Sequence, residues 1–183
     1  MPKLVTSIMS ESSTTTQVAD HIKSRYTAYY HTADPDAKGL FYSADCMQIC
    51  RPIPSYAAKD GATIVRYLQE SLKNGQSMNN AADGLEPGST IRPLRDDEFM
   101  FESDDVVAPI GYTSAELKQK AEKEEWVGTR VDLWFPVPDG SEMLCKVHYW
   151  WRKEGDEWVQ ILHDIMYIGP RDGSEGTAGE NID

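Results

Sequence analysis

The segments WVGTRVDLWFPV (126–137), MLCKVHYWWR (143–152) and WVQILHDIMYI (158–168) decide the fold of this chain. All three are rich in the aromatic and β-branched residues that favour strands. Pro138-Asp139-Gly140 joins the first two segments, and residues 153–157, which include Gly155, join the last two. Both joints have the residues of tight turns, so the region predicts a three-stranded antiparallel meander.

Three helical patterns precede the meander. From about Thr14, apolar residues recur at helical spacing on one face, at 18, 22, 26 and 29 or 30. Asp34-Pro35 supplies an N-cap and a first-turn proline for a short second helix through Tyr42. Asp60 caps a third helix with an apolar stripe. Helices followed by a curved antiparallel sheet predict an α+β cup that holds a small apolar molecule.

The remaining segments carry weaker patterns. Residues 46–51 predict a brief first strand, and weak alternation predicts another strand around 99–101. Thr113 and Glu116 have capping-box spacing and open a charged helix, 115–125, which we expect to be an exposed insertion. Residues 74–88 read as a loop rich in Gly, Asn and Ser. Whether this loop and the charged helix form a lid stays open.

Composition sets limits on organisation and partners. A chain of 183 residues fits one domain, which we place at 14–169, between disordered ends at 1–13 and 170–183. There is no signal core and no long apolar run, and the cysteine count is odd. These features favour free thiols and a cytoplasmic location. A net charge of −12 with scattered Lys and Arg argues against nucleic-acid and membrane partners.

Motif searches favour no metal and no cofactor. The chain has no glycine-rich phosphate loop, dinucleotide fingerprint or Gly-x-Ser-x-Gly elbow. Cys46 and Cys50 resemble half of a zinc site, but no nearby Cys or His pair completes four ligands. Two semi-buried thiols on a strand are the better interpretation.

The order of elements resembles the NTF2-like, or SnoaL-like, cone fold. The phrases that carry the resemblance are 40–45 (LFYSAD), 59–68 (KDGATIVRYL) and the final strand pair turning before Trp158. The resemblance covers about 14–168 and implies a cone-shaped α+β barrel with N-terminal helices packed on the sheet. Members of this superfamily commonly dimerise through the outer face of the sheet, so a homodimer is expected.

Within this superfamily the chain is most similar to scytalone dehydratase and related fungal enzymes. The 149–153 and 163–165 stretches match the final strands of that enzyme, and Tyr30 falls on its pocket tyrosine. His31 replaces its pocket aspartate and Cys50 its second pocket tyrosine. The stretches that match its two histidine-bearing strands contain no histidine. The resemblance therefore implies the same cup-shaped fold with a different reaction.

The resemblance also sets which strand positions face the pocket, and a one-residue slip would invert them all. The expected pocket positions are Cys46, Gln48, Cys50, Cys145, Val147, Tyr149, Trp151, Ile161, His163, Ile165 and Tyr167. Trp134, His148 and Trp150 would form an aromatic patch on the outer face, where we expect the homodimer contact.

Candidate catalytic groups follow from this assignment. His163 and His31 are the expected proton carriers, because imidazole titrates near neutrality. Tyr30 and Tyr149 could donate hydrogen bonds to a developing oxyanion. The expected substrate-binding residues are Tyr26, Gln48, Cys50, Tyr149 and Arg51. Arg51 would hold an anionic group if the first strand is shifted by one, and is otherwise a surface or interface residue.

Two functions remain after the sequence analysis. The first is a cofactor-independent isomerase, cyclase or dehydratase (a lyase) that acts on a polyketide- or terpenoid-like molecule in secondary-metabolite biosynthesis, by acid–base catalysis in an apolar cavity. The second is a non-catalytic ligand-binding or dimerisation module, in which the tyrosines are ordinary packing and His163 is a buried histidine.

Overall fold

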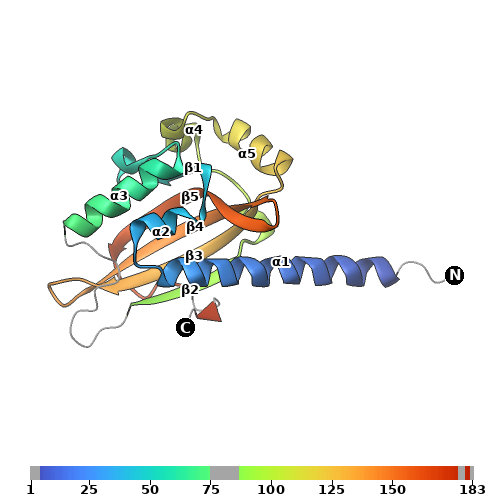
Figure 1. Ribbon diagram of the computed structural model, residues 1–183, viewed down its shortest axis with the longest axis horizontal. Coiled ribbons are helices and arrows are strands. Elements are labelled where there is room, and N and C mark those ends of the chain that lie inside the picture. The colour runs from blue at the N-terminus through green and yellow to red at the C-terminus, as the bar shows by residue number, and fades with distance from the viewer. Residues whose placement is uncertain (1–4, 75–86, 177–179, 182–183) are drawn as a thin grey trace.

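The computed structural model describes residues 5–74, 87–176 and 180–181, and confirms an α+β fold with N-terminal helices packed on a curved sheet (Figure 1). The strands are arranged in the order β1-β5-β4-β3-β2-β6. β1 (Tyr42–Cys50) pairs parallel to β5 (Glu157–Pro170), and the other pairs are antiparallel. The sheet is open at β1, so the cone does not close into a complete barrel.

The central strands form the predicted meander. β3 (Val127–Pro136), β4 (Glu142–Glu154) and β5 are consecutive antiparallel neighbours. Thr129 lies opposite Tyr149, which in turn lies opposite His163. Gly140 and Gly155 adopt φ values of 85° and 61° in the two turns, a conformation that costs glycine least.

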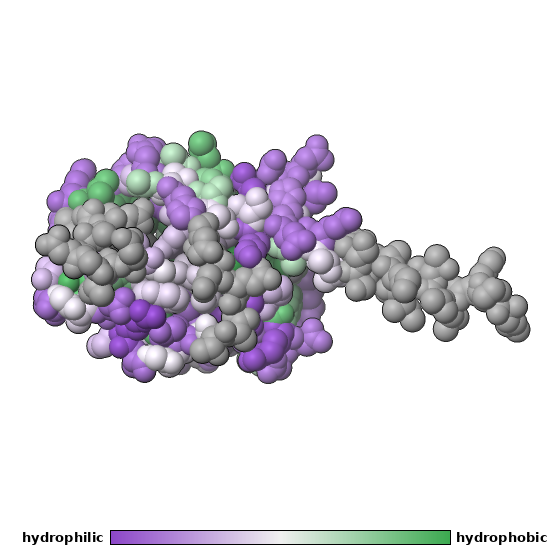
Figure 2. Space-filling view, turned by 90° about the horizontal axis from the view of Figure 1, so that it is seen from below, coloured by the Kyte–Doolittle hydropathy of each residue, from purple (hydrophilic) through white to green (hydrophobic). Residues whose placement is uncertain are grey.

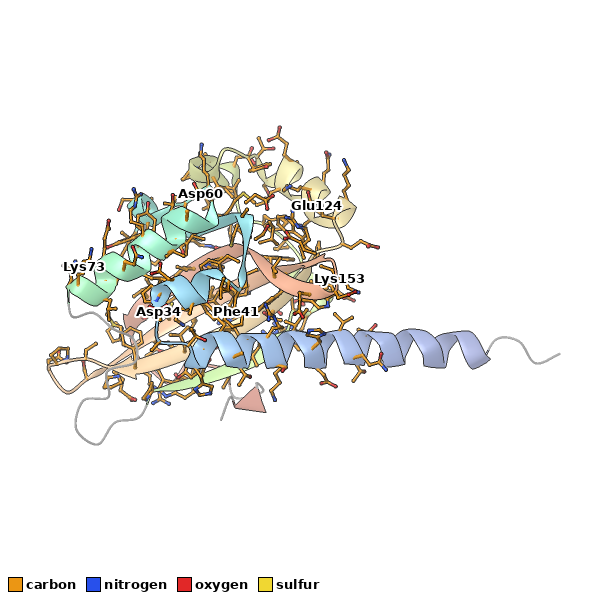
Figure 3. The ribbon with its side chains drawn as sticks, in the orientation of Figure 1. Asp34, Phe41, Asp60, Lys73, Glu124 and Lys153 are labelled. Atoms are coloured by element: carbon orange, nitrogen blue, oxygen red, sulfur yellow. The ribbon has the colours of Figure 1, made fainter. Side chains whose placement is uncertain are left out.

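The first helices begin where the capping residues indicate, although two boundaries differ from expectation. The side chains of Asp34 and Asp60 accept hydrogen bonds from the first turns of α2 (Pro35–Gly39) and α3 (Gly61–Lys73) (Figure 3). α1 (Val5–His31) begins before Thr14. α2 was expected to reach Tyr42, but it ends at Gly39 and Tyr42 already begins β1. The buried Tyr42 and Cys46 lie on the same face of the extended chain, and this packing overrides the weak helical pattern.

The strand expected around 99–101 was wrong. β2 (Gly88–Pro93) is the strand of this region, and it pairs with β3 and with the short β6 (Glu180–Asn181). Phe99 and Phe101 instead follow a 3-10 turn, η2 (Asp96–Glu98), and pack on Trp150 with ring centroids 4.9 and 4.8 Å away. Their aromatic character reflects this packing rather than a strand.

The two faces of the sheet have separate cores, so the molecule has three layers. The inner face packs against α1 and α3 through residues such as Ile22, Tyr26 and Ile64. The outer face is covered by the 94–126 segment, which contains α4 (Asp104–Val107), η3 (Ala108–Ile110) and α5 (Ser114–Lys123). A further 3-10 turn, η1 (Pro54–Tyr56), follows β1.

The expectation that the 115–125 helix is exposed was also wrong. Thr113 and Glu116 form the expected capping box at the start of α5. However, Leu117 and Ala121 are fully buried in the outer core, although the rest of α5 is highly charged. Two apolar residues four positions apart are enough to attach a short helix to a sheet.

The C-terminal end of the described chain stays close to the sheet, whereas the N-terminal half of α1 extends beyond it (Figure 1). Arg171 pairs with Glu142, and the Gly176 N–H donates to Asp132 on β3 (2.7 Å). The proposed boundaries at 13 and 169 stay predictions, and most of the 74–88 loop lies outside the described residues.

Candidate functional site

The inner face of β5 carries His163, as the strand phase predicted. Cys46, Cys145, Val147, Tyr149, Trp151 and Ile165 also belong to the inner core. The expectation was wrong for Ile161, which lies in the outer core, and for Tyr167, which pairs with outward-facing Lys146. The cause is the pair of register shifts in the β4–β5 ladder, between 146 and 147 and between 150 and 151. Such bulges reverse the alternation locally.

Two glutamine amides flank the His163 imidazole. Its Nε2 lies 2.6 Å from Oε1 of Gln160, and its Nδ1 lies 3.4 Å from Oε1 of Gln48. Gln48 Nε2 donates to the Tyr56 carbonyl (2.9 Å), which leaves Gln48 Oε1 facing the imidazole. The thiol of Cys46 is 3.8 Å from Nε2. Both amide oxygens only accept, so the single proton of a neutral imidazole can serve one of the two contacts. We assign it to Nε2, the shorter contact, which leaves Nδ1 with its lone pair toward Gln48 Oε1.

Tyrosine rings cover this imidazole. Tyr149 and Tyr42 meet its ring edge to face, with centroids 4.9 and 5.1 Å away. Tyr26 stacks on Tyr149 at 5.3 Å, and the hydroxyls of Tyr29 and Tyr42 lie 3.1 Å apart. The result is a water-poor cluster that contains several neutral hydroxyl and amide groups.

Burial dominates the electrostatics of this cluster. It lowers the pKa of His163 to about 3, with a smaller contribution from the positive charge of Lys38. Burial also raises the pKa of Tyr29, Tyr42 and Tyr149, so these phenols stay protonated. At neutral pH the cluster holds an uncharged base beside uncharged hydrogen-bond donors.

The inner face becomes more exposed toward the C-terminal end of β5. Along this strand, His163 is fully buried, whereas Ile165 and Ile168 are half-buried. β3 shows the same change from Val131 to the half-buried Phe135. We call Phe135, Ile165 and Ile168 the mouth residues, because they are partly exposed apolar residues of the inner core at this end.

The structure brings together only part of the predicted site. Tyr26, Gln48, Tyr149 and His163 form one contact network, and Cys50 pairs with Ile165 on the same face. Tyr30 joins through Tyr26 at 6.3 Å. His31 is exposed at the end of α1, where its ring contacts Tyr30.

Arg51 faces the other side of the sheet. Its guanidinium makes two hydrogen bonds to the buried carboxylate of Asp164 (2.9 and 2.6 Å) and one to Glu102 (2.8 Å). The shifted first strand that would have put Arg51 in the cup does not occur, because Gln48 faces His163.

Several residues around His163 were not among the predicted site residues, namely Tyr29, Lys38, Tyr42 and Gln160. Gln160 carried one signal in the sequence, since it is an amide within an apolar strand. Tyr42 was assigned to a helix and so escaped notice. Lys38 donates to the Tyr29 carbonyl (2.9 Å), and burial lowers its pKa to about 8. No local pattern indicates that α2 would bring this lysine near His163.

The aromatic patch proposed for a homodimer is buried within the chain itself. Trp150 is fully buried under Phe99 and Phe101, and His148 is only 8% exposed. Trp134 is half-buried, with the Arg171 guanidinium 4.4 Å from its ring centroid. The patch thus gives no reason for dimerisation, and the homodimer stays a prediction.

The described part of the chain also limits other kinds of site. Its three cysteines are free and buried. Within it, no group of three His, Cys, Asp or Glu residues is arranged to hold a metal ion. None of its helices has the length and hydropathy that a membrane crossing requires.

A family profile for the SnoaL-like domain matches residues 11–183. This family includes polyketide cyclases and dehydratases. A search of curated protein sequences returns no match.

Solved structures share the fold at low sequence identity. An NTF2-like protein with a cystatin-like fold from Novosphingobium aromaticivorans has 14% identity and a TM-score of 0.50, over 96% of this chain and 94% of that one. A provisionally named scytalone dehydratase from the same species has 10% identity and a TM-score of 0.46, over 84% and 87%. A hexachlorocyclohexane dehydrochlorinase has 12% identity and a TM-score of 0.44, over 84% and 88%.

Proposed function

The chain belongs to the SnoaL-like domain family, and on that premise we propose that it is a cofactor-independent isomerase, cyclase or dehydratase. Its substrate would be a small apolar or aromatic molecule of polyketide or terpenoid type, as in secondary-metabolite biosynthesis. The observation that carries the proposal is the buried, neutral imidazole of His163, held between two amides on the inner face.

Nδ1 of His163 is the proposed base. The short bond to Gln160 holds the imidazole proton on Nε2. The lone pair of Nδ1, which faces Gln48 Oε1 at 3.4 Å, would accept a proton from an acidic C–H of the substrate once that amide turns aside. The proton then returns to another substrate atom, or leaves with a hydroxide as water in a dehydration. The low pKa keeps the imidazole in its basic form at every physiological pH.

Neutral donors near His163 would stabilise the negative charge that develops on the substrate oxygen. The Nε2 of Gln160 is buried and has no hydrogen-bond partner among the described residues. The Tyr29 and Tyr42 hydroxyls share one hydrogen bond, so one phenolic proton stays available. Such donors stabilise an enolate more strongly in a dry site than in water.

The substrate would enter past the mouth residues. Because the Tyr42 and Tyr149 rings contact the imidazole of His163, one of these rings must move before a substrate atom can reach Nδ1. Tyr30 and Cys50 would contact the apolar body of the substrate. His31 lies outside the buried cluster, so the proposal gives it no part in proton transfer.

Deuterium exchange into 2-tetralone tests this proposal without knowledge of the substrate. In D2O, base-catalysed removal of an α-proton and return of a deuteron erase a resolved proton NMR signal. We expect exchange above the buffer rate, and a rate about 10²-fold lower for His163→Gln. The exposed His21 provides the control variant His21→Gln, which should exchange like the unsubstituted chain. Between pH 5 and 8 the catalysed rate should be constant.

The alternative is a non-catalytic ligand-binding or dimerisation module. The packing of Tyr26, Tyr42 and Tyr149 around His163 favours it, since the chain's own rings fill this part of the face. Line broadening of 2-tetralone without catalysed exchange would support a binding module. Equal exchange by the His163→Gln variant would remove His163 from the mechanism.

A further inference from the structure

A polar cleft lies on the outer face of the sheet, which is the face opposite the His163 cluster. It is a half-open cleft of about 140 Å³ over β2 and β3. Its walls include three arginines, two hydroxyl side chains and the chain just after β5, at Arg92, Arg95, Arg130, Thr90, Ser174 and Gly176. Seen from below, the coloured surface on the side where β2 lies is mainly hydrophilic (Figure 2).

The two carboxylates of the cleft are already neutralised. Glu98 accepts hydrogen bonds from both Nη atoms of Arg92 (2.6 and 2.7 Å), and from the backbone N–H and Nη2 of Arg95 (2.9 and 3.1 Å). Asp132, which is 1% exposed, accepts from Arg130 Nε (2.6 Å) and from the Gly176 N–H (2.7 Å). Neither carboxylate leaves the cleft with an uncompensated negative charge.

The guanidinium of Arg130 has hydrogen-bond donors that remain unused within the described part of the chain. Its Nε is bound to Asp132, but no described residue accepts from its two Nη atoms. Its side chain is 21% exposed, so these donors are partly withdrawn from water. An arginine held by Nε presents its Nη pair as a planar fork, the arrangement that binds an oxyanion.

His148 lies beside the cleft without being one of its lining residues. It lies directly across the β3–β4 ladder from Arg130, on the same face. Its Nε2 is buried and has no hydrogen-bond partner among the described residues. A buried polar atom without a partner is costly, and such atoms usually meet a ligand or an ordered water.

We propose that this cleft binds a small oxyanion, of the size of phosphate or a short dicarboxylate. The three arginines of the cleft face its two lining carboxylates, and Asp97, 3.5 Å from Arg95 Nε, adds a third negative charge at its edge. The proposal therefore rests on the Nη donors of Arg130 that are unused within the described residues rather than on net charge. The Nη pair of Arg130 would hold two oxygens, and Arg95 and the Thr90 hydroxyl would contact the others.

The wall formed by Ser174 and Gly176 is anchored to the sheet. Lys146 Nζ donates to the Ser174 carbonyl (3.1 Å) and to its hydroxyl (2.7 Å). The Gly176 bond to Asp132 fixes the same segment from the other side. This lysine adds a further positive charge near the cleft.

Calorimetric titration of the intact chain tests the site, with sodium phosphate and sodium malonate as probes at constant ionic strength. Sodium chloride serves as the reference anion. We expect Arg130→Gln to weaken oxyanion binding by at least about tenfold, the loss of a charge-assisted bond. Arg66→Gln, an exposed position on α3, is the matched control and should bind like the unsubstituted chain. The stronger of the two probes identifies the head group.

Location is checked by NMR. The amide signal of Gly176 should shift on titration, while that of Gly155, in the distant β4–β5 turn, should not. If Arg130→Gln does not fold, Arg95→Gln replaces it, because this side chain is 67% exposed. Absence of binding by both probes, or equal binding by a folded Arg130→Gln or Arg95→Gln variant, would overturn the proposal. Neither result bears on His163, which lies on the other face.

Discussion

The central strands bury one histidine on each face of the sheet, and different groups surround the two imidazoles. On the inner face, His163 lies among neutral amides and phenols, and the surrounding core is partly exposed at the end of β5. On the outer face, His148 lies between Asp164 and Arg130 under the 94–126 segment. Burial lowers the pKa of both, to about 3 for His163 and about 4 for His148. The difference therefore lies in the neighbours rather than in the histidines.

These neighbours indicate separate roles for the two faces. Outer charges are paired across elements: Arg51 joins Asp164 to Glu102, and Arg152 joins β4 to Glu124 at the end of α5 (Figure 3). Such pairs fix the inserted segment on the sheet. The inner cluster is held by neutral groups that can exchange a proton without breaking an ion pair. The outer ion pairs attach the insertion to the sheet, whereas the inner cluster is where we propose proton chemistry.

Loss of the Trp150 side chain from the outer face should lower the free energy of unfolding more than any other change predicted below. This side chain is fully buried between Phe99 and Phe101, so Trp150→Ala should lower the free energy of unfolding by about 4 kcal/mol. Trp134→Ala, at a half-buried position, should cost clearly less. Chemical denaturation measures both. Equal losses of unfolding free energy would mean that the 94–126 segment does not exclude water from this face of the sheet.

Loss of the Arg51 guanidinium should have the next largest effect. Arg51→Ala leaves the carboxylate of Asp164, which is 2% exposed, without its bidentate partner, at a cost of about 3 kcal/mol. Arg51→Ala combined with Asp164→Asn should recover part of this loss, because the buried charge is then absent. Urea denaturation measures the stability of both variants. An Arg51→Ala variant as stable as the unsubstituted chain would contradict the prediction.

The pH dependence of stability sharpens the comparison at His163. Its pKa is about 3 when folded and about 6.5 when unfolded, so the unfolded chain binds the extra proton as the pH falls through this range. Stability should therefore decrease below pH 6.5, by up to about 1.4 kcal/mol for each pH unit down to about pH 3. His163→Gln removes this contribution but keeps that of His148. Unfolding measured at pH 7, 6 and 5 should show a smaller decrease for the variant. Parallel curves would show that His163 is not buried in its neutral form.

The hydroxyl pair should give the smallest effect. Tyr42→Phe removes the bond to Tyr29 without changing the ring packing, and should cost about 1 kcal/mol. Tyr30→Phe is the control, because this half-buried ring contacts Tyr26 and His31 by packing. Thermal unfolding distinguishes the two variants. A larger loss for Tyr30→Phe would show that the Tyr29–Tyr42 bond does not stabilise the cluster.

The sequence predicted what local chemistry determines. Turn residues and strand composition identified the meander, and capping residues identified the starts of α2, α3 and α5. The inward side of His163 followed from the resemblance to scytalone dehydratase, which set the phase of the last strand. The sequence failed where tertiary packing decides. Two bulges turned Ile161 and Tyr167 outward, and only the folded sheet shows that Leu117 and Ala121 attach a charged helix to it.

The protonation state of His163 tests the account most directly, and it can be read from the imidazole nitrogen signals by ¹⁵N NMR. The account predicts a neutral ring with its proton on Nε2 from pH 8 to pH 5, and no titration in that range. A His163 signal that titrates near pH 6.5 would contradict the dry inner face, and with it the proposed base.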